Sequence, residues 1–178
     1  SRLRPLTALL PALAEKNAAL RRQGEADEML EEELLAGRLY TGPMFQKYNL
    51  VCRAAIDEAP DFMKEAFEAS CKGNRYTTTL HVLNSMVVKC SKLTTATKVY
   101  RGSAKGVLPD SFWTPNAHGV RGGVEAAFMS TTTDRSVAVG YASRKSLSGR
   151  EATPMLFEMQ QGMVDRGAEL SWLSQYPH

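Results

Sequence analysis

Two short stretches of the sequence join a strand-like apolar run to polar groups that could bind a ligand. In the first, KVYRG (98–102), Arg101 follows Val-Tyr and directly precedes Gly102. The planar guanidinium of arginine can engage two oxygens of a phosphate or carboxylate at once. Gly102 has no side chain, so a ligand or a neighbouring backbone can come close. An anion-binding strand end is one interpretation, and a surface salt bridge beside a turn is the other.

The second stretch, AFMSTTTD (127–134), places four consecutive hydroxyl residues, Ser130 to Thr133, after an apolar run. These hydroxyls could form a wall of a ligand site. They also suit a strand edge, after which Asp134 would cap a helix. The sequence alone leaves both interpretations open.

Between the two stretches lies HGVRGGVE (118–125), whose Gly122-Gly123 pair suits a flexible loop or a close approach to a ligand. His118 could act as a base, but no serine or cysteine nucleophile motif accompanies it. The sequence also lacks a phosphate-binding G-x-x-x-x-G-K-[ST] loop and a G-x-G-x-x-G dinucleotide fingerprint. We therefore predict neither a catalytic triad nor either of these nucleotide sites.

Other polar residues are expected to be structural. Glu31 to Glu33 contain a Glu-x-Glu spacing, but positions i and i+2 of a helix point to different faces, so we expect a solvated helical face. His81 lies among leucine and valine residues, which favours a core or boundary position over a ligand role.

Composition narrows the class of protein. The 178 residues suffice for one domain with a sizeable core, or for one domain with a helical annex. The net charge of +3 is small and the basic residues are scattered along the chain, which argues against a nucleic-acid-binding protein. No apolar run is long enough to span a membrane. Cys52, Cys71 and Cys90 lack metal-site spacing and are expected to be free thiols. Cysteine usage and the lack of a signal-peptide pattern favour the cytoplasm.

The elements that would position these groups change in character near Thr94. Before it, apolar residues at helical spacing predict helices, one of them opened by Asp61 and stopped by Gly73. After it, strands are predicted at 97–103, 126–133 and 153–160, with a short helix opened by Asp134. GAELSWLSQYP (167–177) closes the chain with weak alternation, which predicts a strand around Glu169. This order predicts an α+β protein.

The order of motifs resembles that of the R-S-E mono-ADP-ribosyltransferases, a family that includes arginine-modifying bacterial toxins and vertebrate ecto-enzymes. KVYRG (98–102) is similar to the family's arginine strand. GGVEAAFMSTTTD (122–134) is similar to its serine motif, with Ser-Thr-Thr where Ser-Thr-Ser is usual. LYTGPMFQKYN (39–49) resembles its helix with a paired Tyr-Asn, and LSWLSQYP (170–177) resembles the segment that leads to the catalytic glutamates.

The resemblance implies a fold and a set of site residues. The helical N-terminal half would pack on a split two-sheet β core, and NAD would bind across the split. Arg101 would hold the NAD phosphates, Gly102 would offer backbone bonds to the nicotinamide amide, and Ser130 would orient the catalytic glutamate. The resemblance also implies supporting roles for Thr131 and Thr132 in the same wall, Tyr141 over the nicotinamide, and Arg144 as a second phosphate-binding arginine.

The implied activity is transfer of ADP-ribose from NAD to a protein side chain, with arginine as the expected acceptor and nicotinamide as the product. No metal is implied. The implied organisation is an N-terminal helical segment, 1–38, and a transferase-like domain, 39–178, whose C-terminal part is missing. The family's Glu-x-Glu pair is expected directly after His178, and we assign its role to none of Glu125, Glu158 and Glu169. The chain by itself is thus expected to be inactive or nearly so. An NAD glycohydrolase and a non-catalytic binding module are the alternatives.

Overall fold

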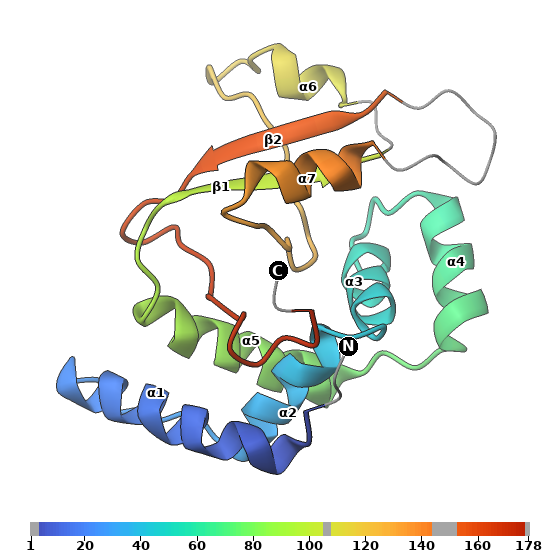
Figure 1. The fold of residues 1–178 in the computed structure, drawn as a ribbon. Helices are drawn as coiled ribbons and strands as arrows, with labels where there is room; N and C mark the ends of the chain where they lie inside the picture. Colours follow the sequence, from blue (N-terminus) through green and yellow to red (C-terminus); the bar gives the residue numbers. More distant parts are fainter. Residues whose placement is uncertain (1–3, 105–107, 144–152, 177–178) are drawn as a thin grey trace. The chain divides into compact units, whose positions relative to one another are not determined.

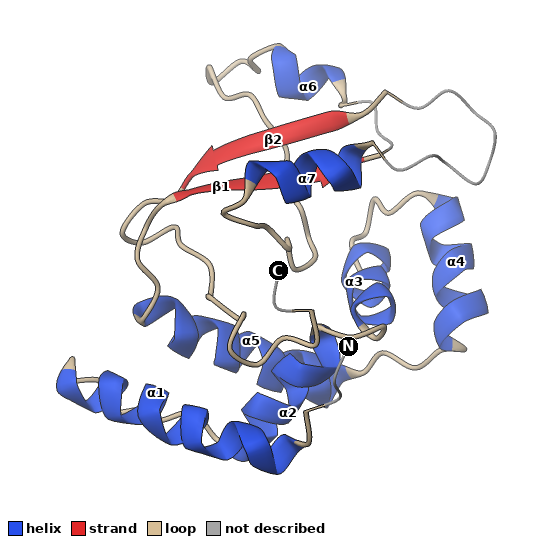
Figure 2. Ribbon diagram, viewed as in Figure 1, coloured by secondary structure: helices blue, strands red, loops and turns tan. Residues whose placement is uncertain are grey.

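A computed structural model describes residues 4–104, 108–143 and 153–176, which contain both helices and strands (Figures 1 and 2). This mixture agrees with the α+β class predicted from the sequence. The chain separates into two compact units, one made of residues 1–95 and 163–178 and the other of residues 96–162. The boundary predicted between residues 38 and 39 falls inside a helix of the first unit.

The first unit is built from helices, as the spacing of its apolar residues predicts. They are the short 3-10 helix η1 (Leu6–Leu9), α1 (Leu10–Arg22), α2 (Glu31–Tyr40), α3 (Phe45–Ala54), α4 (Asp61–Cys71) and α5 (Thr77–Lys92). Helix α4 has Pro60 as its N-cap, so Asp61 is its first helical residue rather than its cap. It ends where Lys72 and Gly73 take φ values of 51° and 76°, and glycine adopts such values without steric cost.

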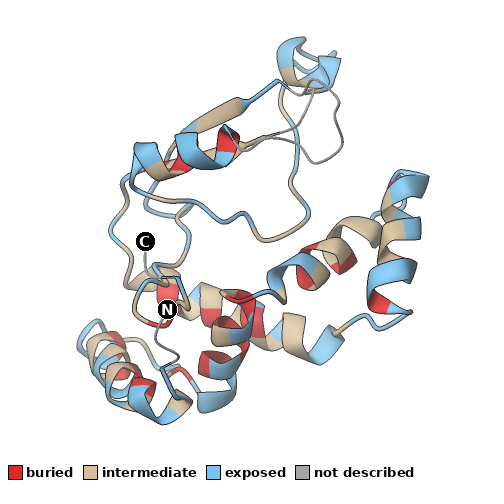
Figure 3. Ribbon diagram, turned by 45° about the vertical axis from the view of Figure 1, so that its right-hand side comes forward, coloured by how far each residue is buried: buried red, intermediate tan, exposed pale blue. Residues whose placement is uncertain are grey.

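The core of the first unit gathers side chains from several helices and from the C-terminal segment. Leu20 of α1, Leu34 of α2, and Leu83 and Met86 of α5 are almost completely buried. Figure 3 shows in red that buried positions occur on several helices. Leu173 is also fully buried, although residues 163–176 contain no strand or helix. The weak alternation near the C-terminus therefore reflects turns that insert one apolar side chain, and the strand predicted around Glu169 is wrong.

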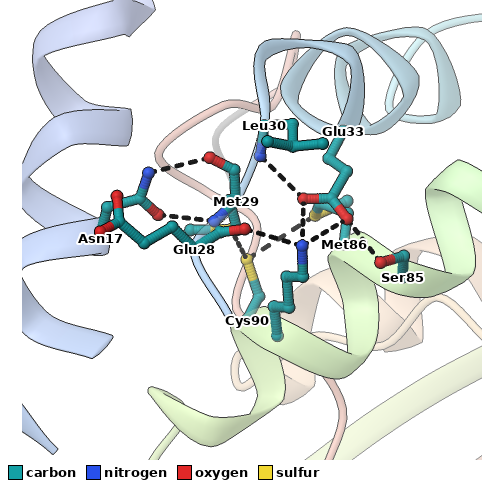
Figure 4. A network of polar contacts seen from close by, with 9 residues as sticks. Asn17, Glu28, Met29, Leu30, Glu33, Ser85, Met86 and Cys90 are labelled. Atoms are coloured by element: carbon teal, nitrogen blue, oxygen red, sulfur yellow. Dashed lines mark hydrogen bonds and ion pairs between the residues drawn. The ribbon is translucent and has the colours of Figure 1, made fainter. Parts of the chain in front are cut away.

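Glu33 corrects the prediction that the three consecutive glutamates form a solvated face. Glu31 and Glu32 are exposed, but Glu33 is buried. Its carboxylate accepts a hydrogen bond from the Leu30 N–H at 2.8 Å and one from the Ser85 hydroxyl, and lies 2.9 Å from the Lys89 ammonium (Figure 4). A charge can be buried when opposite charge and hydrogen bonds replace its water, and here α5 supplies both.

The second unit contains a two-stranded antiparallel sheet. Strand β1 (Lys98–Ser103) pairs with β2 (Met155–Gln160) so that Arg101 lies opposite Phe157. Helix α6 (Asp110–Trp113) follows β1, and α7 (Arg135–Ala142) precedes β2 along the chain. Both strands were predicted. The described ranges hold one sheet of two strands, and the split two-sheet core stays a prediction.

Helix α7 begins as predicted. The Asp134 carboxylate accepts hydrogen bonds from the backbone N–H of Ser136 at 2.7 Å and from its hydroxyl at 2.6 Å. These bonds lower the pKa of Asp134, since they stabilise its charged form. An aspartate cap of this kind satisfies one of the N–H groups that the first turn of a helix leaves without partners.

The strand predicted at 126–133 is wrong. Within this stretch only Thr132 pairs with another segment, through a single bridge to Tyr100. The Asp134 N–H donates to the Thr132 hydroxyl at 3.1 Å. Such local side-chain to backbone bonds compete with strand pairing, and this one turns the chain into α7 directly after the bridge.

Candidate functional site

The structure brings the two chemically suggestive stretches together. Tyr100 and Thr132 exchange backbone hydrogen bonds of 2.7 and 2.9 Å. The neighbouring Arg101 is half-buried, and its Nη1 donates to the backbone carbonyl of Ser130 at 2.8 Å. The arginine strand and the serine motif thus lie side by side within one compact unit, although 29 positions separate Arg101 from Ser130 in the sequence.

The contact with Ser130 also gives Arg101 a structural role. A carbonyl oxygen that does not belong to a regular sheet needs a donor, and the guanidinium supplies one. It uses one of the five N–H donors of arginine. This hydrogen bond therefore attaches Arg101 to the serine motif. A guanidinium also has the planar shape that can bind a phosphate.

Gly102 is required by packing in the second unit. A Cβ atom at this position would lie 1.8 Å from the Ala138 carbonyl oxygen and 2.8 Å from the Ala142 nitrogen. Both atoms belong to the backbone of α7, so no side-chain movement could relieve the overlap. The sequence allowed either a ligand or a neighbouring backbone to come close to Gly102. The structure shows the close approach of a neighbouring backbone, that of α7. The backbone bonds to nicotinamide stay a prediction.

The hydroxyl residues divide into two groups. Thr132 is half-buried, pairs with Tyr100 and accepts the Asp134 N–H, so its role is structural. Ser130 and Thr131 are exposed to solvent. Of these three hydroxyl residues, the first two are therefore accessible to solvent and the third belongs to the bridge with Tyr100.

Tyr141 lies on α7 and is 50% exposed. This exposure argues against simple packing of the ring into the core of the unit. Arg144, the other residue assigned from this region, lies outside the described residues.

The three glutamates left without a catalytic role each have a local partner. Glu158 of β2 forms an exposed ion pair with Lys98 of β1 at 2.6 Å. A hydrogen bond and the positive charge from Lys98 lower the pKa of Glu158, which keeps it ionised. Glu125 accepts from the Ala127 N–H at 3.1 Å, and Glu169 accepts from the Ser171 N–H at 2.6 Å.

A residue that the sequence analysis did not single out organises the glycine-containing loop. The Asn116 side-chain oxygen accepts hydrogen bonds from the N–H groups of His118 at 2.9 Å and Val120 at 3.0 Å. Gly119 takes a φ of 72°. Asparagine side chains typically bond to the backbone two residues on in such turns, so Asn116, three positions before Gly119, could have been identified from the sequence.

The two histidines that the structure describes belong to no group that could hold a metal ion. His81 and His118 are both exposed, so the predicted core or boundary position of His81 is wrong. Across the ranges that the structure describes, no group of three or more His, Cys, Asp or Glu side chains could hold a metal ion. None of the helices in those ranges is long and apolar enough to cross a membrane.

A groove of about 390 Å³ lies in the first unit. Leu10, Leu13, Met29 and Leu30 are among the residues that line it. Asn17 also lines this groove, but its amide oxygen and nitrogen already bond to the Met29 backbone, both at 2.8 Å. The groove belongs to a different unit from Arg101 and does not support the NAD assignment.

Comparisons with known proteins return no match to a family model, to a curated protein or to a solved structure. A functional assignment therefore depends on the motifs and on the geometry of the second unit.

Proposed function

We propose that this chain forms the NAD-binding part of an R-S-E mono-ADP-ribosyltransferase, which transfers ADP-ribose from NAD to an arginine side chain of an acceptor protein and releases nicotinamide. The observation that carries the proposal is the 2.8 Å hydrogen bond from Arg101 to the Ser130 carbonyl. This bond joins the two motifs whose order in the sequence suggested the family. In the proposed fold, β1 and β2 belong to one of two small sheets.

The proposed roles follow from the chemistry of each group. Arg101 binds the phosphates of NAD, because a guanidinium can engage two oxygens of an anion. Backbone groups at Gly102 bind the nicotinamide amide, and the exposed ring of Tyr141 covers the nicotinamide. The exposed side of the hydroxyl cluster, Ser130 with Thr131, faces the reacting groups.

The reaction breaks the bond between nicotinamide and ribose, and the ribose develops oxocarbenium character as in glycoside cleavage. A carboxylate beside the ribose stabilises that charge. Glu125, Glu158 and Glu169 are occupied by local contacts, and we assign this task to none of them. In the proposed family the glutamate pair follows the segment that includes Gln175 and Tyr176.

The test uses the natural polypeptide that contains this chain together with whatever follows His178 in it. We expect NAD binding by calorimetry, release of nicotinamide, and ADP-ribose attached to an added acceptor protein. ADP-ribose found only free in solution would instead indicate an NAD glycohydrolase. NAD binding without nicotinamide release would indicate a binding module, and the absence of both would refute the proposal.

A further inference from the structure

The C-terminal segment, residues 171–176, is held on the first unit although it forms no helix or strand. Leu173 anchors it in the core with no exposed surface. A segment without regular pairing has backbone carbonyls that need donors from elsewhere.

Two arginines from the N-terminal helical region supply those donors. Arg4 donates to the Trp172 carbonyl at 3.1 Å and to the Ser174 carbonyl at 2.8 Å. Arg38 of α2 donates to the carbonyl between them, that of Leu173, at 2.7 Å. Three consecutive carbonyls thus accept from charged donors more than 130 positions earlier in the sequence. Hydrogen bonds of this charge-assisted kind are stronger than those between neutral groups.

Gln175 completes the attachment. Its side-chain amide donates to the Arg38 carbonyl at 2.9 Å, and its backbone N–H donates to the Thr41 hydroxyl at 3.3 Å. A Cβ atom on Gly42 would lie 2.2 Å from the Gln175 amide nitrogen. The Gln175 side chain therefore occupies the space beside Gly42, in the turn after α2, that a Cβ atom would fill.

Gathering the two guanidinium groups has an electrostatic cost. Burial and the positive charge of Arg4 lower the pKa of Arg38. Arg38 also donates to the backbone carbonyl of Arg4 at 3.3 Å. The two like charges lie near each other because they donate to adjacent carbonyls of one segment, Arg4 to those of Trp172 and Ser174 and Arg38 to that of Leu173.

We propose that Arg4 and Arg38 are positioning residues that fix the C-terminal segment on the helical unit and thereby set the starting point of the polypeptide that follows Tyr176. This inference rests on the proposed function, in which the catalytic glutamates come after this segment. Neither arginine touches NAD in the proposal. They act through the segment that they hold.

The first test measures the segment itself. In Arg38→Ala, we expect backbone amide exchange at Leu173 and Gln175 to accelerate by about tenfold or more, since local opening loses a charge-assisted hydrogen bond. Arg38→Lys should restore part of the protection, because lysine can serve one carbonyl. Arg22→Ala, which removes an exposed arginine at the end of α1, serves as the control and should leave this exchange unchanged.

The second test measures catalysis in the natural polypeptide. We expect Arg38→Ala to lower kcat by about tenfold while the KM for NAD stays within about twofold, since only the placement of the reacting groups changes. Loss of stability alone would reduce the amount of folded protein, so kcat is expressed per folded molecule. Arg38→Lys should then recover part of kcat.

Two results would overturn the inference. Unchanged amide exchange in Arg38→Ala and Arg4→Ala, in a protein that releases nicotinamide, would refute the attachment alone. An unsubstituted protein that binds no NAD and releases no nicotinamide would refute the proposed function, and with it the catalytic consequence of the attachment, whatever the exchange shows.

Discussion

The Arg101 guanidinium donates a hydrogen bond to the backbone carbonyl of Ser130 at 2.8 Å. Because the acceptor is a backbone atom, substitution of the Ser130 side chain leaves this bond in place. Variants at the two positions therefore test different properties. Arg101 variants alter both the proposed anion-binding group and the hydrogen bond to the serine motif, whereas Ser130 variants alter one hydroxyl.

We expect Arg101→Lys to weaken NAD binding by about tenfold to a hundredfold, which corresponds to the loss of a charged hydrogen-bonding contact of about 1.5–3 kcal/mol. Ser130→Ala should instead lower the rate of nicotinamide release by about tenfold, with NAD affinity little changed. Calorimetry and single-turnover kinetics separate the two effects. Equal nicotinamide release in both variants and the unsubstituted protein would refute the site assignment.

Gly102→Ala should destabilise the second unit, because the new methyl group would overlap the α7 backbone at Ala138. We expect a loss of about 1–3 kcal/mol or more, as for other forced overpacking. The measurement is urea denaturation followed by circular dichroism.

Gly140→Ala is the matched control for Gly102→Ala, since it adds the same methyl group to a glycine in α7 itself. A Cβ at Gly140 would meet no atom within 4 Å. Alanine is the better helix former, so this variant should gain about 0.5–1 kcal/mol. If both variants had the same stability, the close approach of β1 and α7 would be wrong.

Glu33→Ala should lower the free energy of unfolding by about 3–5 kcal/mol, because it leaves the largely buried Lys89 ammonium without its carboxylate partner and with the Glu28 carbonyl as acceptor. The side chains of Lys89 and Glu33 are only 16% and 4% exposed. The exposed neighbour Glu32 provides the control, and Glu32→Ala should change stability by no more than about 0.5 kcal/mol. Similar losses from both substitutions would contradict the buried network.

The cysteines should react with a thiol reagent in a fixed order. None of the three forms a disulfide bond; Cys52 is half-buried, whereas Cys71 and Cys90 are buried. Burial raises the pKa of Cys71, and raises that of Cys90 to about 12. Since the thiolate is the reactive form, Cys52 should be alkylated first and Cys90 last in native protein at pH 8. Alkylation of Cys90 as fast as that of Cys52 would contradict its placement.

The raised pKa of Cys90 also predicts a pH dependence of stability. Between its ordinary value of 9.0 and about 12, the unfolded thiol has lost its proton while the folded thiol keeps it. The contribution of this group is therefore complete below about pH 9 and is lost as the pH rises toward 12. Urea midpoints at pH 8 and pH 10.5 should differ less in Cys90→Ala than in the unsubstituted protein.

Much of the fold follows from local patterns in the sequence. Apolar residues at helical spacing were enough to place the helices of the first unit, and Asp134 marked the start of α7 because a cap needs only the residues that follow it. Strands β1 and β2 were also recognised from short β-rich runs. These are properties of neighbours along the chain, so the sequence by itself reveals them.

Long-range packing decided the rest. The burial of Glu33 depends on Ser85 and Lys89, more than 50 positions away, and the need for glycine at position 102 comes from the backbone of α7. Residues 167–176 form no strand, and Arg38 of α2 and Arg4 donate to the carbonyls of Leu173 and Ser174 within them. The local secondary-structure propensity of a sequence does not predict such contacts, because the partner residues come together only when the chain folds.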